Sequence, residues 1–102
     1  MTATTPKAAG HLIPGNAALG RAIRRLRKKR GATIEGLALD AGMHPTYLSG
    51  IERGVRNPTW EVLRGLSWAL DVSVATIAAD AEAEAELAKR TEQARRELGM
   101  AA

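Results

Sequence analysis

Three glycine residues divide the middle of this 102-residue chain into short segments. Gly31, Gly42 and Gly54 each follow a stretch in which apolar residues recur at helical spacing. Glycine readily adopts the left-handed backbone conformation that ends many helices, so each of these positions predicts a helix terminus. A chain with such closely spaced helix ends is constrained to fold as a bundle of short helices around one core.

The composition agrees with an all-α fold of one domain. A length of 102 residues and an apolar content of 45% are ordinary for a single globular domain. Phe is absent, and Tyr47, Trp60 and Trp68 are the only aromatic residues. The core must therefore consist mainly of Leu, Ile, Val and Ala, which is typical of packed helices.

Residues that favour helix starts stand where the periodic segments begin. Asn16 is expected to cap the first helix, Thr33 the second and Ser73 the fifth, because their side-chain oxygens can accept hydrogen bonds from free backbone N–H groups. Pro45 suits the first position of the third helix, since its fixed φ is helical and its missing N–H has no partner there.

The fourth helix follows the turn VRNP and has two candidate caps. Asn57 and Thr59 both precede its periodic residues. At its end, Asp71 stands where a helix-ending glycine is more usual. The residues expected on its inner stripe are Trp60, Leu63, Leu66 and Leu70.

The two ends of the chain differ from this middle part. Residues 1–15 mix Thr, Ala, Gly and Pro without a period, and we expect a disordered N-terminal arm. Residues 16–79 form the expected globular domain. Residues 80–102 are rich in Ala, Glu and Arg and are predicted to form a charged helical tail.

The charged tail offers two ion pairs at i,i+4 spacing, Glu86 with Arg90 and Glu92 with Arg96. It contains only two leucine residues, so a sustained coiled-coil seam is not supported. The favoured interpretation is that the tail continues the fifth helix as a frayed helix. The alternative is that it packs on Trp68 of the same or a second subunit.

The charge is distributed unevenly. The net charge is +4, but residues 1–79 hold 11 Lys and Arg against 5 Asp and Glu, while residues 80–102 hold 4 against 6. Seven of the ten residues in RAIRRLRKKR, residues 21–30, are basic. Such a run favours a polyanionic partner, although a solvated basic face is an equal alternative on charge alone.

Several classes of protein are excluded or disfavoured. The chain has no Cys, which excludes disulfides and thiolate metal sites, and no metal or cofactor is expected. There is no apolar run near ~18 residues and no export signal, so we expect a cytoplasmic protein without a membrane span. No Ser/His/Asp set or glycine-rich phosphate loop is present, which indicates a protein that is not an enzyme.

The segments over residues 33–53 have the spacing of a helix-turn-helix motif. With the basic first helix and the ERG turn, the chain resembles the Xre/Cro-like helix-turn-helix family, which includes phage repressors and restriction-modification controller proteins. The resemblance covers residues 19–77 and is carried by LGRAIRRLRKKRG, LALDAGM, TYLSGIERGVRNP and LSWALDVSVATI. It implies a five-helix, lambda-repressor-like bundle in which residues 45–53 form the recognition helix.

The family resemblance implies a sequence-specific transcriptional regulator, a repressor or autoregulator. Such a protein binds inverted repeats in double-stranded DNA as a homodimer. A second hypothesis is an antitoxin or protein-interaction module, whose charged tail or Trp68 face binds a partner protein while the helical body autoregulates.

The major groove is about 12 Å wide and admits one α-helix, whose outward residues meet the edges of the bases. Thr46 ranks first among the candidate readers, because its hydroxyl can donate or accept and its methyl can touch thymine. Pro45 stands where relatives often carry Gln, Arg or Ser, and Tyr47 has an alternative role in covering the edge of the core. The residues predicted to read bases are Pro45, Thr46, Tyr47, Ser49 and Gly50.

Gly50 is unusual because it lies in mid-helix, where glycine costs about 1 kcal/mol relative to alanine. A compensating gain is expected if the helix lies close against DNA or against the second helix. The alternative is a surface position that tolerates any residue.

A second group of residues is predicted to contact phosphates. In the family, a carboxylate at Glu52 pairs with an arginine at Arg27, and a buried carboxylate needs such a partner. His44 replaces the usual Ser or Thr cap and is expected to cap poorly, so a turn residue and a DNA contact are equal alternatives. The predicted phosphate contacts are Arg27, Thr33, His44, Arg53, Arg56 and Asn57.

The dimer interface is expected on the fifth helix and the turn before it. Trp68 is not needed by the predicted core, and an exposed Trp is often an interface anchor. Packing of Trp68 against the charged tail is the alternative. The residues predicted in the interface are Trp68, Val72, Val74 and Ile77.

Overall fold

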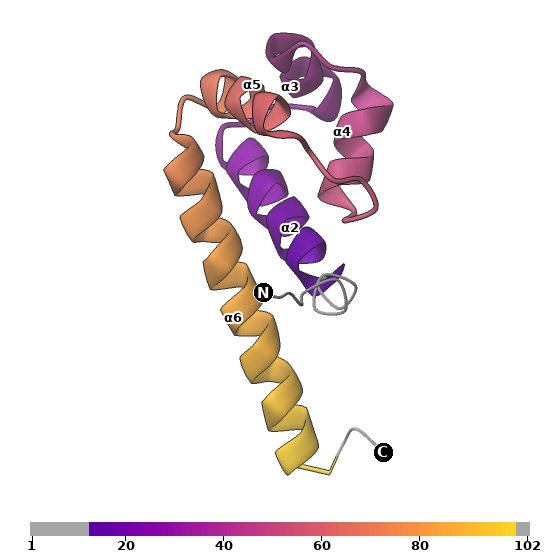
Figure 1. Cartoon of the computed structure of the whole chain (residues 1–102), viewed down its shortest axis with the longest axis vertical. Coiled ribbons are helices and arrows are strands. Elements are labelled where there is room, and N and C mark those ends of the chain that lie inside the picture. Colours follow the sequence, from indigo (N-terminus) through magenta and orange to yellow (C-terminus); the bar gives the residue numbers. More distant parts are fainter. Residues whose placement is uncertain (1–12, 100–102) are drawn as a thin grey trace, which may run out of the picture.

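The computed structural model describes residues 13–99, and over this range the chain forms five helices and no strand (Figure 1). The prediction of an all-α, five-helix bundle is therefore confirmed. Of the predicted N-terminal arm, residues 1–12 lie outside the described residues. The helices are α2 (Ile13–Lys29), α3 (Ile34–Ala41), α4 (Pro45–Glu52), α5 (Trp60–Leu70) and α6 (Val74–Glu97).

Two helix boundaries differ from those predicted. α2 begins at Ile13 rather than after a cap at Asn16, so Asn16 lies within its first turn. Pro14 does not prevent this earlier start, because the first-turn N–H groups of a helix have no intrahelical partners. The second difference is the end of α4. The helix was predicted to end at Arg53, but it ends at Glu52, and Arg53 is the capping residue.

Side-chain caps begin three of the helices as expected. Thr33 accepts a hydrogen bond from the backbone N–H of Gly36 at 2.9 Å, and Ser73 accepts one from Thr76 at 3.0 Å. At the start of α5 the cap is Thr59, which accepts from the N–H of Val62 at 3.2 Å. The structure therefore favours Thr59 over Asn57 as the cap of this helix.

The end of α5 uses a left-handed residue that is not glycine. Asp71 has φ 58° and ψ 42°, and its N–H bonds back to the carbonyl of Trp68. Asp is among the few non-glycine residues that adopt this conformation with some frequency. Asp71 stands where a glycine is more usual, and the structure shows that α5 nevertheless ends there.

Every helix contributes to one apolar core. Burying a Leu or Ile side chain stabilises a fold by about 1.5–3 kcal/mol, so these shared contacts hold the five helices together. The largest fully buried side chains are Ile23 of α2, Leu37 of α3, Leu48 and Ile51 of α4, Leu66 of α5 and Ile77 of α6.

The expected place of Trp60 on the inner stripe is wrong, because its exposed fraction is 62%. Trp60 and the buried Leu66 are six residues apart on α5, which puts them about 120° apart around a helix. The buried side of α5 is formed by Leu66, Ala69 and Leu70. Trp60 begins the helix at its solvent side.

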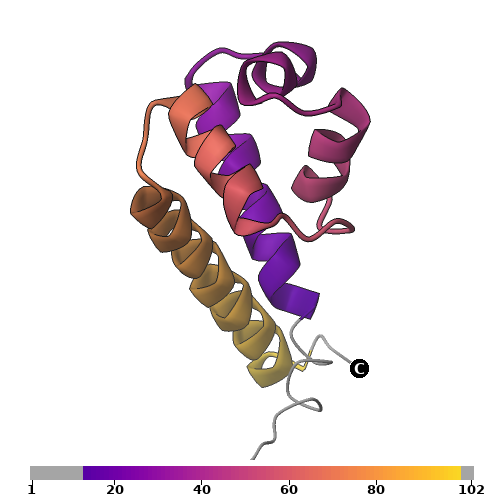
Figure 2. The same cartoon turned by 45° about the horizontal axis from the view of Figure 1, so that its top comes forward.

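α6 is one continuous helix that lies along α2, on the side of α2 away from α4 (Figures 1 and 2). The prediction that the charged tail continues the fifth helix is confirmed. Its two predicted ion pairs are present, Arg90 with Glu86 at 3.4 Å and Arg96 with Glu92 at 3.3 Å. All residues from 85 to 99 are exposed, and the boundary predicted between residues 79 and 80 falls inside the helix.

Among the described helices, none is long and apolar enough to cross a membrane by itself. Only α5 and α6 taken together have the required length and composition, and they are bent by 100° at the turn between them.

Candidate nucleic-acid interface

α3 and α4 form a pair of short helices joined by a tight turn, and α4 lies at the edge of the molecule (Figure 1). Gly42 ends α3 with φ 76°, and the N–H of Met43 bonds to the carbonyl of Ala38 at 2.9 Å. α4 buries Leu48 and Ile51 against the core. Its opposite side is left for contacts outside the chain.

The free side of α4 carries Thr46, which is exposed, with Pro45 and Ser49, which are half-buried. These three residues lie close to the first turn of α3. Together with Ile34 and Glu35 they line a shallow hollow between the two helices, called the α3–α4 hollow below. The hydroxyl groups of Thr46 and Ser49, two of the residues predicted to read bases, are therefore on one surface.

Gly50 does not belong to this surface, and its predicted outward position is wrong. The residue is buried, and a Cβ placed on it would lie 2.5 Å from Cγ of Arg56. The chain turns back after α4, and the N–H groups of Val55 and Arg56 both bond to the carbonyl of Gly50. The absence of a side chain at Gly50 therefore makes room for Arg56, not for DNA or α3.

Tyr47 is half-buried and packs against the core. Its hydroxyl donates a hydrogen bond to the backbone carbonyl of Asn57 at 3.4 Å, which connects α4 to the following turn. The structure thus supports the alternative in which Tyr47 covers the edge of the core. A base contact by Tyr47 stays a prediction.

His44 caps α4, contrary to the expectation that it would cap poorly. Its Nδ1 accepts a hydrogen bond from the backbone N–H of Thr46 at 3.1 Å. In a neutral imidazole whose Nδ1 accepts, the hydrogen lies on Nε2. Because His44 is exposed, this Nε2–H is a donor available at the start of α4.

The predicted ion pair between Arg27 and Glu52 is confirmed, and both side chains are buried. Nε of Arg27 donates to Oε2 of Glu52 at 2.7 Å, and Nη2 donates to Oε1 at 2.9 Å. The remaining Nη1 donates to the carbonyl of Ala32 at 2.9 Å. This bidentate pair, called the clasp below, joins α2 to the last residue of α4.

The hydrogen bonds that Arg27 donates to Glu52 raise the pKa of Arg27, against the opposing effect of burial, and the negative charges of Glu52 and Glu35 add to the increase. Arg27 is 9% exposed, and all three of its nitrogen atoms already donate hydrogen bonds. Three of the five guanidinium N–H groups of Arg27 therefore donate within the chain, and a phosphate contact through the other two stays a prediction. The role of Arg27 that these contacts show is to position α4.

A second contact between α2 and α4 was not predicted. A Cβ placed on Gly20 would overlap the backbone carbonyl oxygens of Ile51 and Glu52. The backbones of the two helices are therefore in close approach beside the clasp. The glycine in the ALGRA segment is the only local signal of this approach, and it does not name the partner.

Cationic and polar side chains surround the C-terminal end of α4. Arg53, Arg56 and Asn57 are exposed, as phosphate contacts would require. Nε of Arg53 donates to the hydroxyl of Ser49 at 3.4 Å, so this arginine lies next to the predicted base readers. Thr33 is also exposed, but its hydroxyl serves as the cap of α3.

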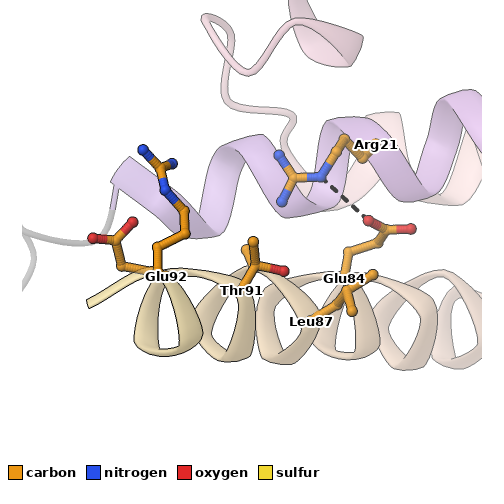
Figure 3. A pocket seen from close by; sticks show the side chains of 7 residues that line it. Arg21, Glu84, Leu87, Thr91 and Glu92 are labelled. Carbon is orange, nitrogen blue, oxygen red and sulfur yellow. Dashed lines mark hydrogen bonds and ion pairs between the residues drawn. The ribbon is translucent and has the colours of Figure 1, made fainter. Parts of the chain in front are cut away.

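Two arginines of the basic run of α2 form ion pairs with α6, so they do not face the polyanionic partner that the run suggested. Nε of Arg21 lies 3.2 Å from Oε1 of Glu84, and Nη1 of Arg25 lies 2.5 Å from Oε2 of the same carboxylate. Figure 3 shows the side chains of Arg21 and Glu84 pointing toward each other. Nη2 of Arg25 also lies 3.8 Å from Oδ2 of Asp80. The sequence contained a signal for these pairs, since two arginines and two carboxylates are each four residues apart.

The predicted dimer surface is exposed only in part. Trp68 is 76% exposed, and Val72 and Val74 are half-buried. The predicted place of Ile77 in the interface is wrong. Its side chain is 1% exposed, because it packs from α6 into the core. The high exposure of Trp68 also shows that the described part of the tail of the same chain, residues 80–99, does not cover it.

Two short helices joined by a tight turn, of which the second is held to α2 by the clasp and carries exposed polar side chains, define the helix-turn-helix class of domains. The chain belongs to this family. The family model described as a helix-turn-helix domain matches residues 18–80.

The relatives are transcriptional regulators. The HTH-type transcriptional regulator SlrR of Bacillus subtilis is 44% identical over 57 residues, which are 55% of this chain and 38% of SlrR. The chain spans 38% to 54% of the length of the first curated relatives that it matches. The names of these relatives describe regulators of transcription.

Solved structures agree with the fold and with the Xre/Cro-like resemblance. The clp gene regulator ClgR from Corynebacterium glutamicum has a TM-score of 0.80 and 34% identity, covering 82% of this chain and 89% of ClgR. SinR, described as the master regulator for biofilm formation and solved in complex with DNA, has a TM-score of 0.56 and 42% identity, covering 58% and 95%. A restriction-modification controller protein is also similar, as the sequence motifs predict.

Proposed function

We propose that this protein is a sequence-specific, DNA-binding transcriptional regulator, a repressor or autoregulator that acts in the cytoplasm. The observation that carries the proposal is the position of α4. The clasp holds the last residue of α4 to α2, and the opposite side of α4 presents Thr46 and Ser49. A helix held in this way can enter the major groove without losing its orientation. The SinR structure in complex with DNA supports this use of the fold.

Base reading falls to the residues that line the α3–α4 hollow. The hydroxyl groups of Thr46 and Ser49 can each donate or accept a hydrogen bond, and the methyl of Thr46 can contact thymine. Pro45 offers only apolar contact at the start of the helix. The sequence preference of this chain therefore differs from that of relatives with a long polar side chain at this position.

Phosphate contacts are assigned to the groups around the ends of α4. Arg53, Arg56 and Asn57 are exposed at its C-terminal end, and the Nε2–H of His44 is available at its start. The backbone at the start of α3, near Thr33, is a further candidate. These contacts position the protein on the duplex and carry no sequence information themselves.

A homodimer is part of this proposal, because two recognition helices can then read half-sites one helical turn, about 34 Å, apart. The exposed Trp68, with Val72 and Val74, is the proposed interface. The antitoxin hypothesis is less well supported, since the matched relatives are regulators of transcription. The division into an arm, a DNA-binding domain and a charged tail also stays a proposal.

The test is selection of bound duplexes from a random pool, followed by affinity measurements at several salt concentrations. We expect an enriched inverted repeat with half-sites one turn apart. If the dimer neutralises about 6 phosphates, the slope of log K against log salt is about −5. A flat salt dependence with no enriched sequence would contradict the proposed function.

A further inference from the structure

Glu35 occupies an unusual position for a carboxylate on a surface proposed to bind DNA. Of the five residues that line the α3–α4 hollow, Glu35 alone is charged. It is exposed, and among residues 13–99 every ion pair that the structure shows involves a carboxylate other than Glu35. The negative charge therefore lies beside the hydroxyl groups of Thr46 and Ser49, and it acts on the buried Arg27 without forming an ion pair among the described residues.

One role of Glu35 is local. An acidic residue in the first turn of a helix interacts favourably with the helix dipole, and Glu35 is in the first turn of α3. Glu61 has the same place in α5, so this role is not special to Glu35. What distinguishes Glu35 is its place in the hollow, next to the residues proposed to read bases.

The chemistry of the major groove decides what such a carboxylate can contact. An ionised carboxylate only accepts hydrogen bonds, and phosphates repel it. Guanine presents the acceptors N7 and O6, thymine presents O4, and adenine presents the acceptor N7 beside its amino group. Cytosine presents the N4 amino group as a donor without an adjacent acceptor on the same base.

We propose that Glu35 is a specificity-determining residue, which selects a cytosine in each half-site by accepting a hydrogen bond from the N4 amino group. This inference rests on the proposed function, because α4 must lie in the major groove to bring the hollow to the bases. Pro45 places no long polar side chain in the hollow, so Glu35 is the group that meets the base there. The selected cytosine lies next to the base that Thr46 reads, since both residues line the same hollow.

The experiment compares the wild-type protein with Glu35→Gln and Glu35→Ala. Duplexes are first selected from a random pool with each protein, and affinities are then measured for the selected site with each of the four bases at the cytosine position. The wild type is expected to prefer cytosine about 10-fold. Glu35→Gln should lose this preference and accept adenine, because an amide both donates and accepts. Glu35→Ala should lose it without gaining adenine.

Two matched variants control for charge and for the helix dipole. Glu61→Gln removes a carboxylate from the same position of another helix, and Glu82→Gln removes an exposed one from α6. Both should keep the cytosine preference, while all three Glu→Gln variants raise the affinity for DNA that lacks the selected site, at low salt. The inference is overturned if Glu35→Gln keeps the preference, or if a control variant loses it equally. If the wild type enriches no sequence at all, the proposed function fails together with the inference.

Discussion

Arg27 and Glu52 join the last turn of α2 to the end of α4 through two hydrogen bonds of 2.7 and 2.9 Å. Because both side chains are buried, the pair has a cost in desolvation that its own hydrogen bonds must offset. The same pair fixes where α4 lies relative to α2. The clasp therefore links the stability of the fold to the orientation of the proposed recognition helix.

Removal of one partner of the clasp should be much more harmful than removal of both. Glu52→Leu leaves the Arg27 guanidinium buried without a counter-charge, and we expect a loss of about 3–5 kcal/mol in the free energy of unfolding. The double variant Arg27→Met with Glu52→Leu should lose far less than the sum of the two single variants. Denaturant unfolding of all four proteins measures this coupling, and additive effects would contradict it.

The methylene groups of Arg56 cover Gly50, so the effect of adding a side chain at position 50 should depend on whether residue 56 is Arg or Ala. In the wild-type protein a Cβ at position 50 meets Cγ of Arg56 at 2.5 Å, whereas Cβ of Arg56 is 3.4 Å away. Gly50→Ala should therefore stabilise an Arg56→Ala protein by about 1 kcal/mol through helix propensity, and should give less or nothing in the wild type. Equal effects in the two backgrounds, measured by thermal or denaturant unfolding, would show that Arg56 does not constrain Gly50.

The contact between α2 and α6 should depend on salt. Glu84 is shared by Arg21 and Arg25 and is 13% exposed, whereas Glu86 pairs only with Arg90 on an exposed surface. We expect Glu84→Gln to lower the free energy of unfolding by about 1 kcal/mol at low salt and by less at high salt, because mobile ions screen such pairs. Glu86→Gln is the matched control. The interpretation is wrong if the two variants are equally stable at low salt.

The exposed Trp68 should control self-association. Trp60 is a useful comparison, since it lies on the same helix and is also largely exposed, but is not part of the proposed interface. We expect Trp68→Ala to weaken the homodimer by about 2 kcal/mol, as truncation of an interface anchor does, and Trp60→Ala to leave it unchanged. Sedimentation over a range of concentrations gives both values. A wild-type protein that stays monomeric, or equal effects of the two variants, would remove Trp68 from this role.

Local chemistry made much of the fold predictable. Thr33 and Ser73 cap the helices they precede, and Gly42 ends α3 in the left-handed conformation. These features depend on a few neighbouring residues, so they can be recognised in the sequence. The clasp was predicted from the family resemblance, because local patterns do not reveal that Arg27 and Glu52 meet.

The errors share a different origin. Gly50 is covered by Arg56, which approaches only because the chain turns back after α4. Trp60 is exposed because the phase of the buried side of α5 is set by the packing around Leu66. The pairs of Arg21 and Arg25 with α6 require the antiparallel packing of two helices that are distant in sequence. Each of these facts depends on tertiary contacts that no single segment specifies.

The most direct test of the account compares Thr46→Ala and Arg53→Ala on the operator selected by the wild-type protein and on duplexes with single base changes. We expect Thr46→Ala to relax the preference at one base position in each half-site, with a loss of discrimination of about 1–3 kcal/mol. Arg53→Ala should weaken binding to all duplexes similarly and make the salt dependence less steep by about 1 unit per half-site. If both variants keep the affinity and the selectivity of the wild type, α4 is not the recognition helix.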